Sequence, residues 1–110
     1  MTKFDYESSD TSYKLKFLPE ALVEWNNLDG SIKKVLRNAL KKRLNQPRTP
    51  GSELLGDLKN CYKIKLLKQG YRLIYSVEDQ ILVVLVIAID KREKLAAYRA
   101  AIERLIVENR

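Results

Sequence analysis

The chain has 110 residues, enough for one domain with a single core, and its 45% hydrophobic and 32% charged residues are typical of a globular protein. Its 21 lysines and arginines exceed its 14 aspartates and glutamates, so the net charge is +7 and a polyanion is the natural partner. The absence of histidine excludes a Ser-His-Asp triad and histidine-based ribonuclease chemistry, and the single cysteine, Cys61, excludes an internal disulfide.

Several other classes of protein are disfavoured by what the sequence lacks. The start shows no basic and apolar signal-peptide pattern, and the longest apolar run, Ile81–Ile89, is about half a membrane span, so we expect a cytoplasmic protein. The four glycines are scattered and no metal-ligand spacing is present, so we expect neither a nucleotide cofactor nor a metal. The carboxylate pairs Glu20/Glu24 and Glu78/Asp79 fit ordinary solvated positions.

The first half of the chain predicts one strand and two helices. Residues 1–11 are polar and aperiodic and indicate a flexible leader to a single domain over 12–110. Alternating apolar and lysine residues over 13–17 predict a short strand. Residues 19–28 follow as a helix that starts at a proline, and a second helix runs over 31–44 with Ser31 as its cap.

The outer face of this second helix is strongly basic. It carries five cations and no acid: Lys33, Lys34, Arg37, Lys41 and Lys42. Such a face is either simply solvated or a surface for RNA or a protein partner, and the sequence leaves both open.

The second half predicts three strands and a helix. The strands 61–67, 71–77 and 81–89 are joined by short links, which require an antiparallel meander. The third has no polar alternation, so we place it in the middle of the sheet, and residues 95–106 repeat at helical spacing. The fold class is therefore α+β, an antiparallel sheet with two N-terminal helices and a C-terminal helix on one face, leaving the other face free for a ligand.

The pairing of the first two strands of the meander brings cations together. If Lys68-Gln69 forms the loop, Lys65 lies opposite Arg72 and each apolar residue meets another. Lys63, Lys65 and Arg72 then share one face, where they repel one another unless an anion lies between them. The alternative is a lysine-rich face that is merely solvated.

Three segments resemble the RelE toxin family: Cys61-Tyr-Lys-Ile-Lys-Leu, Gly70-Tyr-Arg-Leu-Ile-Tyr, and Lys91-Arg-Glu-Lys followed by Tyr98. The resemblance implies a small RelE-like (microbial ribonuclease-like) fold, cleavage of messenger RNA in the ribosomal A site without metal or cofactor, and a RelB-like antitoxin partner. The family's active-site residues then fall on Lys63, Lys65, Arg72, Arg92 and Tyr98. One departure is Gly56-Asp57, where close relatives carry an arginine.

These residues suit cleavage by attack of a 2′-OH on the adjacent phosphate. Clustered cations stabilise the charge of the phosphorane, and a lysine beside other cations can act as general base, for which Lys63 and Lys65 are candidates. We expect Arg72 to hold the phosphate, Arg92 or a second lysine to protonate the leaving oxygen, and Tyr98 to stack or orient a base. We expect the basic face of the second helix and Lys91 to bind ribosomal RNA.

Two further readings of the sequence remain open. A ParE-like toxin that inhibits a topoisomerase shares this fold, and an inactive RNA-binding module would keep the basic sheet without turnover.

We also expect Arg72 and Arg92 to be surface cations facing water, so that their loss leaves the fold intact. An antitoxin segment is expected to displace the C-terminal helix or cover the cations.

Overall fold

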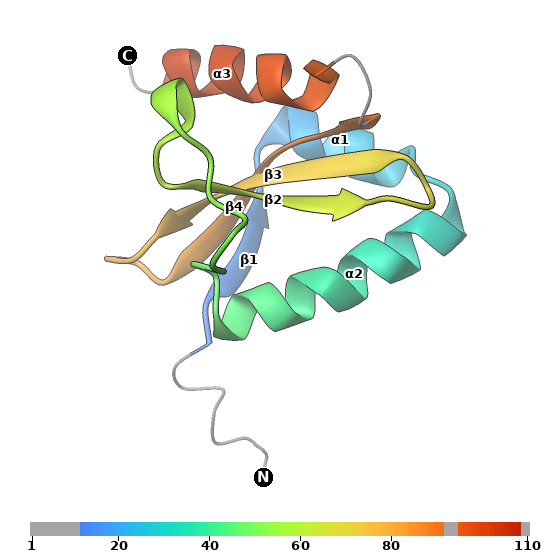
Figure 1. The fold of residues 1–110 in the computed structure, drawn as a ribbon, viewed down its shortest axis with the longest axis horizontal. Helices are drawn as coiled ribbons and strands as arrows, with labels where there is room; N and C mark the ends of the chain where they lie inside the picture. Colours follow the sequence, from blue (N-terminus) through green and yellow to red (C-terminus); the bar gives the residue numbers. More distant parts are fainter. Residues whose placement is uncertain (1–11, 92–94, 109–110) are drawn as a thin grey trace, which may run out of the picture.

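A computed structural model describes residues 12–91 and 95–108, which fold into a sheet flanked by helices, as shown in Figure 1. In chain order the elements are β1 (Lys14–Phe17), α1 (Pro19–Asn26), α2 (Gly30–Asn45), the one-turn 3₁₀ helix η2 (Gly56–Leu58), β2 (Cys61–Leu66), β3 (Tyr71–Glu78), β4 (Val83–Lys91) and α3 (Ala96–Glu108). The predicted leader, residues 1–11, and the predicted site residue Arg92 lie outside the described residues.

The strands form one sheet in the order β1-β4-β3-β2. The α+β class, the antiparallel meander of β2, β3 and β4 and the central place of β4 are confirmed. The prediction of a wholly antiparallel sheet is wrong at one edge, because β1 runs parallel to β4 with Lys14 beside Val83 and Phe17 beside Val86. No hairpin turn joins these two strands, so nothing in the local sequence fixes their relative direction.

The predicted register of the β2–β3 hairpin is confirmed. Lys65 lies opposite Arg72 and Leu66 opposite Tyr71. The loop spans four residues rather than two, since β2 ends at Leu66 and β3 begins at Tyr71. Gly70 closes it in the left-handed region, with φ +74° and its N–H donating to the Leu66 carbonyl at 2.8 Å. The longer loop keeps the same pairs opposite each other, so every predicted face assignment holds.

Helices cover both faces of the sheet, which corrects the prediction of one free face. The phenol of Tyr75 binds Arg43 of α2, whereas Arg72, an odd number of residues away on β3, lies under Tyr98 of α3. Figure 1 shows α2 and α3 on either side of the strands. The reason lies in β4, where consecutive residues from Val86 onward are fully buried and need cover on both sides.

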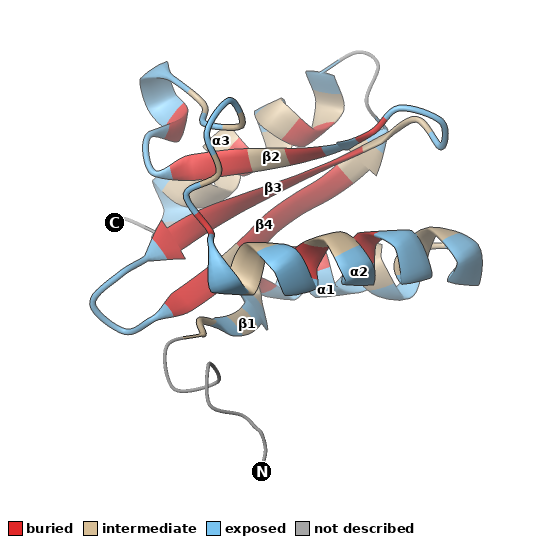
Figure 2. Cartoon of the chain, turned by 60° about the horizontal axis from the view of Figure 1, so that its bottom comes forward, coloured by how far each residue is buried: buried red, intermediate tan, exposed pale blue. Residues whose placement is uncertain are grey.

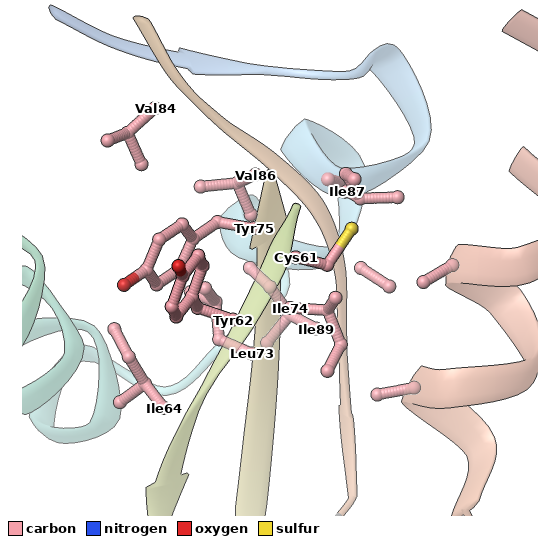
Figure 3. Close-up of a cluster of buried hydrophobic side chains, with 14 of the residues drawn as sticks. Cys61, Tyr62, Ile64, Leu73, Ile74, Tyr75, Val84, Val86, Ile87 and Ile89 are labelled. Atoms are coloured by element: carbon pink, nitrogen blue, oxygen red, sulfur yellow. The ribbon is translucent and has the colours of Figure 1, made fainter. Parts of the chain in front are cut away.

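The core lies along β3 and β4, the deeply buried strands in Figure 2. Its largest fully buried side chains, several of them drawn in Figure 3, are Tyr75, Leu36, Leu40, Leu73, Ile74, Ile87, Val84, Val86 and Cys61. Leu36 and Leu40 are one helical turn apart and fasten α2 to its face of the sheet. Burial raises the pKa of the Cys61 thiol to about 11, so this thiol stays protonated at neutral pH and serves as part of the core packing.

Among the element boundaries that differ from the prediction, two have clear local reasons. Asp29 rather than Ser31 caps α2, because its carboxylate accepts the Ser31 backbone N–H at 3.1 Å. Strand β4 begins at Val83 rather than Ile81, because Ile81 and Leu82 form part of the turn from β3 and are 66% and 42% exposed. Leu82 adopts a φ of +54° in that turn, a conformation that apolar periodicity does not reveal.

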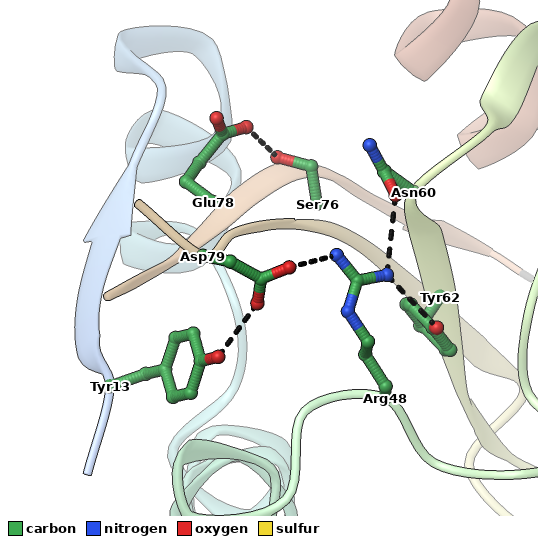
Figure 4. A network of polar contacts seen from close by, with 7 residues as sticks. All are labelled: Tyr13, Arg48, Asn60, Tyr62, Ser76, Glu78 and Asp79. Carbon is green, nitrogen blue, oxygen red and sulfur yellow. Dashed lines mark hydrogen bonds and ion pairs between the residues drawn. The ribbon is translucent and has the colours of Figure 1, made fainter. Parts of the chain in front are cut away.

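A polar network closes the end of the sheet opposite the β2–β3 loop (Figure 4). Arg48, in the segment after α2, pairs with Asp79 of the β3–β4 turn and donates to Asn60 Oδ1 at 3.2 Å and to the Tyr62 hydroxyl at 3.4 Å. Tyr13, just before β1, donates to Asp79 Oδ1 at 2.7 Å. The network thereby joins the chain around both outer strands to the central turn.

Asparagine in place of Asp79 should remove an acid-sensitive part of the stability. The hydrogen bond from Arg48, and then that from Tyr13, holds the pKa of Asp79 below its usual value of 3.8. A carboxyl with a lowered native pKa stabilises the fold above its unfolded pKa, and this stabilisation is lost as the pH falls through the lowered value. The difference in Tm between the wild type and Asp79→Asn should therefore be greatest near neutral pH and shrink in acid.

Thermal unfolding at low salt, from neutral pH to about pH 3, measures this difference. Asp57→Asn, at an exposed position of η2, is the matched control for the loss of one carboxylate. A Tm difference for Asp79→Asn that stays constant over this pH range would contradict the role of the network.

Candidate functional site

Strands β2 and β3 bring three cations to the face of the sheet on which α3 lies. Lys65 and Arg72 are directly opposite each other, a position in which Cβ atoms are about 5 Å apart. Lys63 lies two residues before Lys65 on β2, on the same face and opposite Ile74. The register thus gathers the three sequence-predicted cations into one cluster, which we call the cation site.

Arg72 is far less exposed than expected from the sequence. Only 7% of it is accessible, whereas Lys63 is half-buried and Lys65 is exposed. The expectation that Arg72 is a surface cation facing water is therefore wrong. The cause is the position of α3, since the guanidinium carbon lies 4.2 Å from the centroid of the Tyr98 ring, within cation–π range.

The guanidinium of Arg72 is buried without its full set of hydrogen bonds. Within the part of the chain that the structure describes, its Nε and Nη1 atoms have no acceptor. Unsatisfied donors on a buried charged group cost free energy, because water no longer solvates them. A phosphate oxygen would provide the missing acceptors in the geometry that a guanidinium fork prefers. The chemistry of this arrangement suits an anion.

Tyr98 lies at the boundary between core and surface, half-buried in the first turn of α3. Its ring contacts Arg72, so it forms part of the cation site as well as part of the packing. Leu95, where the predicted helical repeat begins, does not anchor α3, since it is 50% exposed. The fully buried residues of the helix are instead the small Ala97 and Ala101.

The remaining predicted site residues, Lys91 and Arg92, lie at or just after the end of β4. Arg92 lies outside the described residues. Lys91 is exposed and lies opposite Tyr71, so the register places it on the other face of the sheet from Arg72. Asp90 lies opposite Arg72, a position that sequence reasoning missed. A bulge in β4 shifts the register upstream, so counting residues along the chain could not have assigned Asp90 to this face.

The basic face of α2 is remote from the cation site. Lys34, Arg37, Lys41 and Lys42 are exposed and Lys33 is half-buried, on a helix that covers the opposite face of the sheet. The guanidinium of Arg37 also lies 5.7 Å from the centroid of the Trp25 ring, so this cation has a packing role. The two basic surfaces can therefore bind different parts of one large partner.

The cation site is accessible from solvent through Lys63 and Lys65. The best-defined pockets in the described residues lie elsewhere, for example one beside Arg48 and Asp79 and another beside Ile102 and Leu105 of α3. Across residues 12–91 and 95–108 no three metal-ligating side chains lie together, and no helix is long and apolar enough to cross a membrane. An open basic surface suits a polymeric anion.

Comparison with known proteins identifies the family. Residues 15–96 match the family described as ParE toxin of the type II toxin-antitoxin system, parDE. The chain is also 40% identical over 95 residues to the mRNA interferase toxin RelE of Escherichia coli K12, which covers 86% of this chain and 99% of that protein. The chain belongs to the RelE family of toxins.

Solved structures of RelE confirm the predicted fold. Free E. coli RelE carrying two arginine-to-alanine substitutions superposes with a TM-score of 0.78 at 39% identity, covering 86% of this chain and 98% of that chain. RelE in the intact E. coli RelBE toxin-antitoxin complex gives a TM-score of 0.71 at 41% identity, covering 76% of this chain and all of that one. The RelE-like fold predicted from the motifs is thus the observed one.

Proposed function

We propose that the chain is the toxin of a type II toxin-antitoxin system and cleaves messenger RNA in the ribosomal A site. The observation that carries the proposal is Arg72, a buried cation with unsatisfied donors, opposite Lys65 and under the ring of Tyr98. RelE of E. coli, which is 40% identical to this chain over almost the whole length of RelE, is an mRNA interferase. Site chemistry and family therefore support the same reaction.

The reaction needs no group beyond the RNA and the protein's own cations. The 2′-OH attacks the adjacent phosphate and loses its proton to Lys63 or Lys65 in its neutral form, while Arg72 binds the charged phosphorane oxygens. The bond from phosphorus to the 5′-oxygen breaks, and that oxygen takes a proton from the other lysine or from Arg92. The products are a 2′,3′-cyclic phosphate and a 5′-hydroxyl.

Tyr98 contributes through its position above Arg72. One face of the ring holds the guanidinium in place, which leaves the outer part of the half-buried ring to contact a base of the message. The open site provides few contacts that would orient a flexible RNA. We therefore assign that orientation to the ribosome and expect free RNA to be a poor substrate.

The partner that restrains the toxin is a RelB-like antitoxin. RelE forms a complex of this kind in the E. coli RelBE structure, whose RelE chain shares 41% identity with this one. An antitoxin that covers the cation site or moves α3 would stop cleavage. An antitoxin and the ribosome as partners support a cytoplasmic location for the protein.

Primer extension on ribosomes programmed with a defined message tests the proposal. The wild type should cut in the A-site codon, free message should stay intact, and added antitoxin should abolish cutting. The pH dependence of cleavage in Lys63→Ala and Lys65→Ala then identifies the base, because loss of the base removes the limb of the profile that it controls.

The same assay separates the two other functions that fit this fold. The family matched by residues 15–96 is described as ParE toxin, which favours keeping topoisomerase inhibition as a second candidate. Intact message together with blocked DNA supercoiling would support that candidate, whereas RNA binding without any cleavage would indicate an inactive module. Cleavage in the A site excludes both.

Charge reversal on α2 should weaken binding to the ribosome and leave the rate of the cleavage step unchanged. Lys34→Glu combined with Lys41→Glu changes two exposed positions of the basic face. The plot of log affinity against log salt concentration falls with salt, and each lost phosphate contact should make its slope less steep by about 0.7 to 0.9. Sedimentation with ribosomes over a salt series measures it, and Lys14→Glu with Lys16→Glu on β1 is the control of equal charge. Identical slopes in both variants would indicate that the α2 face is only solvated.

A further inference from the structure

Helix α3 packs on the sheet through the apolar side chains of its inner face. Ala97 and Ala101 are fully buried, and Tyr98, Ile102 and Leu105 are half-buried against the core, whereas Leu95 before the helix is half-exposed. Apolar packing is non-directional and does not by itself fix how the helix is turned over the sheet. Yet α3 carries Tyr98 above Arg72, an arrangement that requires the helix to keep its position. A directional polar contact adds to this packing.

That contact is an ion pair between Glu24 of α1 and Arg104 of α3. The sequence suggested that Glu24 is an ordinary solvated carboxylate, which is wrong, because the side chains of Glu24 and Arg104 are only 25% and 17% exposed. Arg104 donates from Nη1 to Glu24 Oε1 at 2.9 Å and from Nη2 to Oε2 at 2.8 Å. This two-pronged geometry is the strong form of an arginine–carboxylate pair.

The same two side chains also bind the backbone of β4. Arg104 Nη1 donates to the Ile87 carbonyl at 2.8 Å, and the Ile89 N–H donates to Glu24 Oε1 at 3.0 Å. Ile87 is the bulged residue that has no partner in the β3 register, and the pairing with β1 ends at Val86. Glu24 and Arg104 thus satisfy polar groups that the sheet itself leaves open.

The ion pair therefore fastens both elements that border the cation site. Arg104 follows Tyr98 by six residues of α3, about 9 Å along the helix axis. Ile89 directly precedes Asp90, the residue opposite Arg72. We propose that Glu24 and Arg104 are positioning residues that hold Tyr98 over Arg72 for the cleavage reaction, an inference that rests on the proposed function for its catalytic part.

The test compares Glu24→Gln, which keeps the shape of the side chain, with Glu103→Gln, which removes the same charge from an exposed position of α3. In the wild type the ring current of Tyr98 should shift the NMR signals of the Arg72 side chain upfield. Glu24→Gln should move these signals toward those of a solvated arginine, and Glu103→Gln should leave them in place. On programmed ribosomes Glu24→Gln should lower kcat by roughly tenfold or more, with KM changed by no more than about twofold.

Arg104→Lys provides a second arm in case Glu24→Gln fails to fold, as judged by circular dichroism. A lysine keeps the charge but cannot bind Glu24 and the Ile87 carbonyl as a fork, so an intermediate shift of the Arg72 signals is expected, with Arg99→Lys on the exposed side of α3 as its control. Arg72 signals that stay at their wild-type positions in folded Glu24→Gln or Arg104→Lys would overturn the inference. The NMR measurement needs no activity, so a wild type that cuts no message would refute the proposed function alone.

Discussion

Alanine at position 72 should lower the rate of message cleavage on programmed ribosomes by on the order of 10²–10³. Arg72 is the buried member of the cation site, and its Nε and Nη1 donors have no acceptor in the described part of the chain. Donors that lack an acceptor gain hydrogen bonds when charge develops on a phosphate within their reach, and the fold already holds them in position. Single-turnover cleavage at saturating toxin measures the chemical step directly.

The same substitution should leave the fold almost unchanged. Removing the guanidinium loses a cation–π contact with Tyr98, worth about 0.5–2 kcal/mol, but also removes the cost of a buried charge with unsatisfied donors. Arg72→Lys should keep part of the rate, since it retains the charge without the fork. Arg99→Ala, an exposed position of α3, controls for the loss of one cation. Growth arrest by Arg72→Ala at wild-type protein levels would show that this site does not cut RNA.

Phenylalanine at position 75 should lower the free energy of unfolding by about 2 kcal/mol. The Tyr75 hydroxyl donates to the Pro47 carbonyl at 2.6 Å and accepts from Arg43 Nη1 at 2.7 Å, and the side chain is fully buried. Burial raises the pKa of Tyr75, so the phenol remains protonated and keeps donating. Without it, a buried carbonyl and a charged donor at the end of α2 both lose their partner.

Thermal unfolding should show this loss as a fall in Tm of about 8 °C. The ring stacked on Tyr62, with centroids 5.8 Å apart, is retained in Tyr75→Phe, so the fall isolates the hydroxyl. Tyr71→Phe changes a half-buried tyrosine at the start of the same strand and should have a much smaller effect. Equal Tm values for the two variants would mean that the hydroxyl of Tyr75 does not stabilise the end of α2.

The sequence predicted those features that depend on the pairing of apolar residues. The run that ends at Ile89 has no polar alternation, which placed β4 in the middle of the sheet. The apolar pattern around the β2–β3 hairpin favours one register and so predicts that Lys65 lies opposite Arg72, as the structure confirms. These inferences succeed because a shift of one residue would turn a whole set of side chains to the wrong face.

The features that escaped prediction depend on contacts distant in sequence. The depth of Arg72 is set by α3, whose position depends on Glu24, 80 residues away from Arg104. The face of the sheet on which Asp90 lies depends on the bulge at Ile87, and the pattern of apolar residues in the sequence does not reveal this bulge. Lone charged residues on helix surfaces look alike in sequence whether or not a partner reaches them.

Strand β2 lies at the edge of the sheet, where unpaired backbone groups could let the toxin aggregate in solution. The first part of its outer side is covered, since Lys63 N–H binds the Ser52 carbonyl and Glu53 bridges to Tyr62. Beyond this point Lys65 lies in the remaining stretch of an edge strand, where a lysine discourages a second sheet from adding on. The charge proposed to serve catalysis thus also guards against aggregation, and a Lys65→Ala toxin should be compared with the wild type at equal soluble concentration.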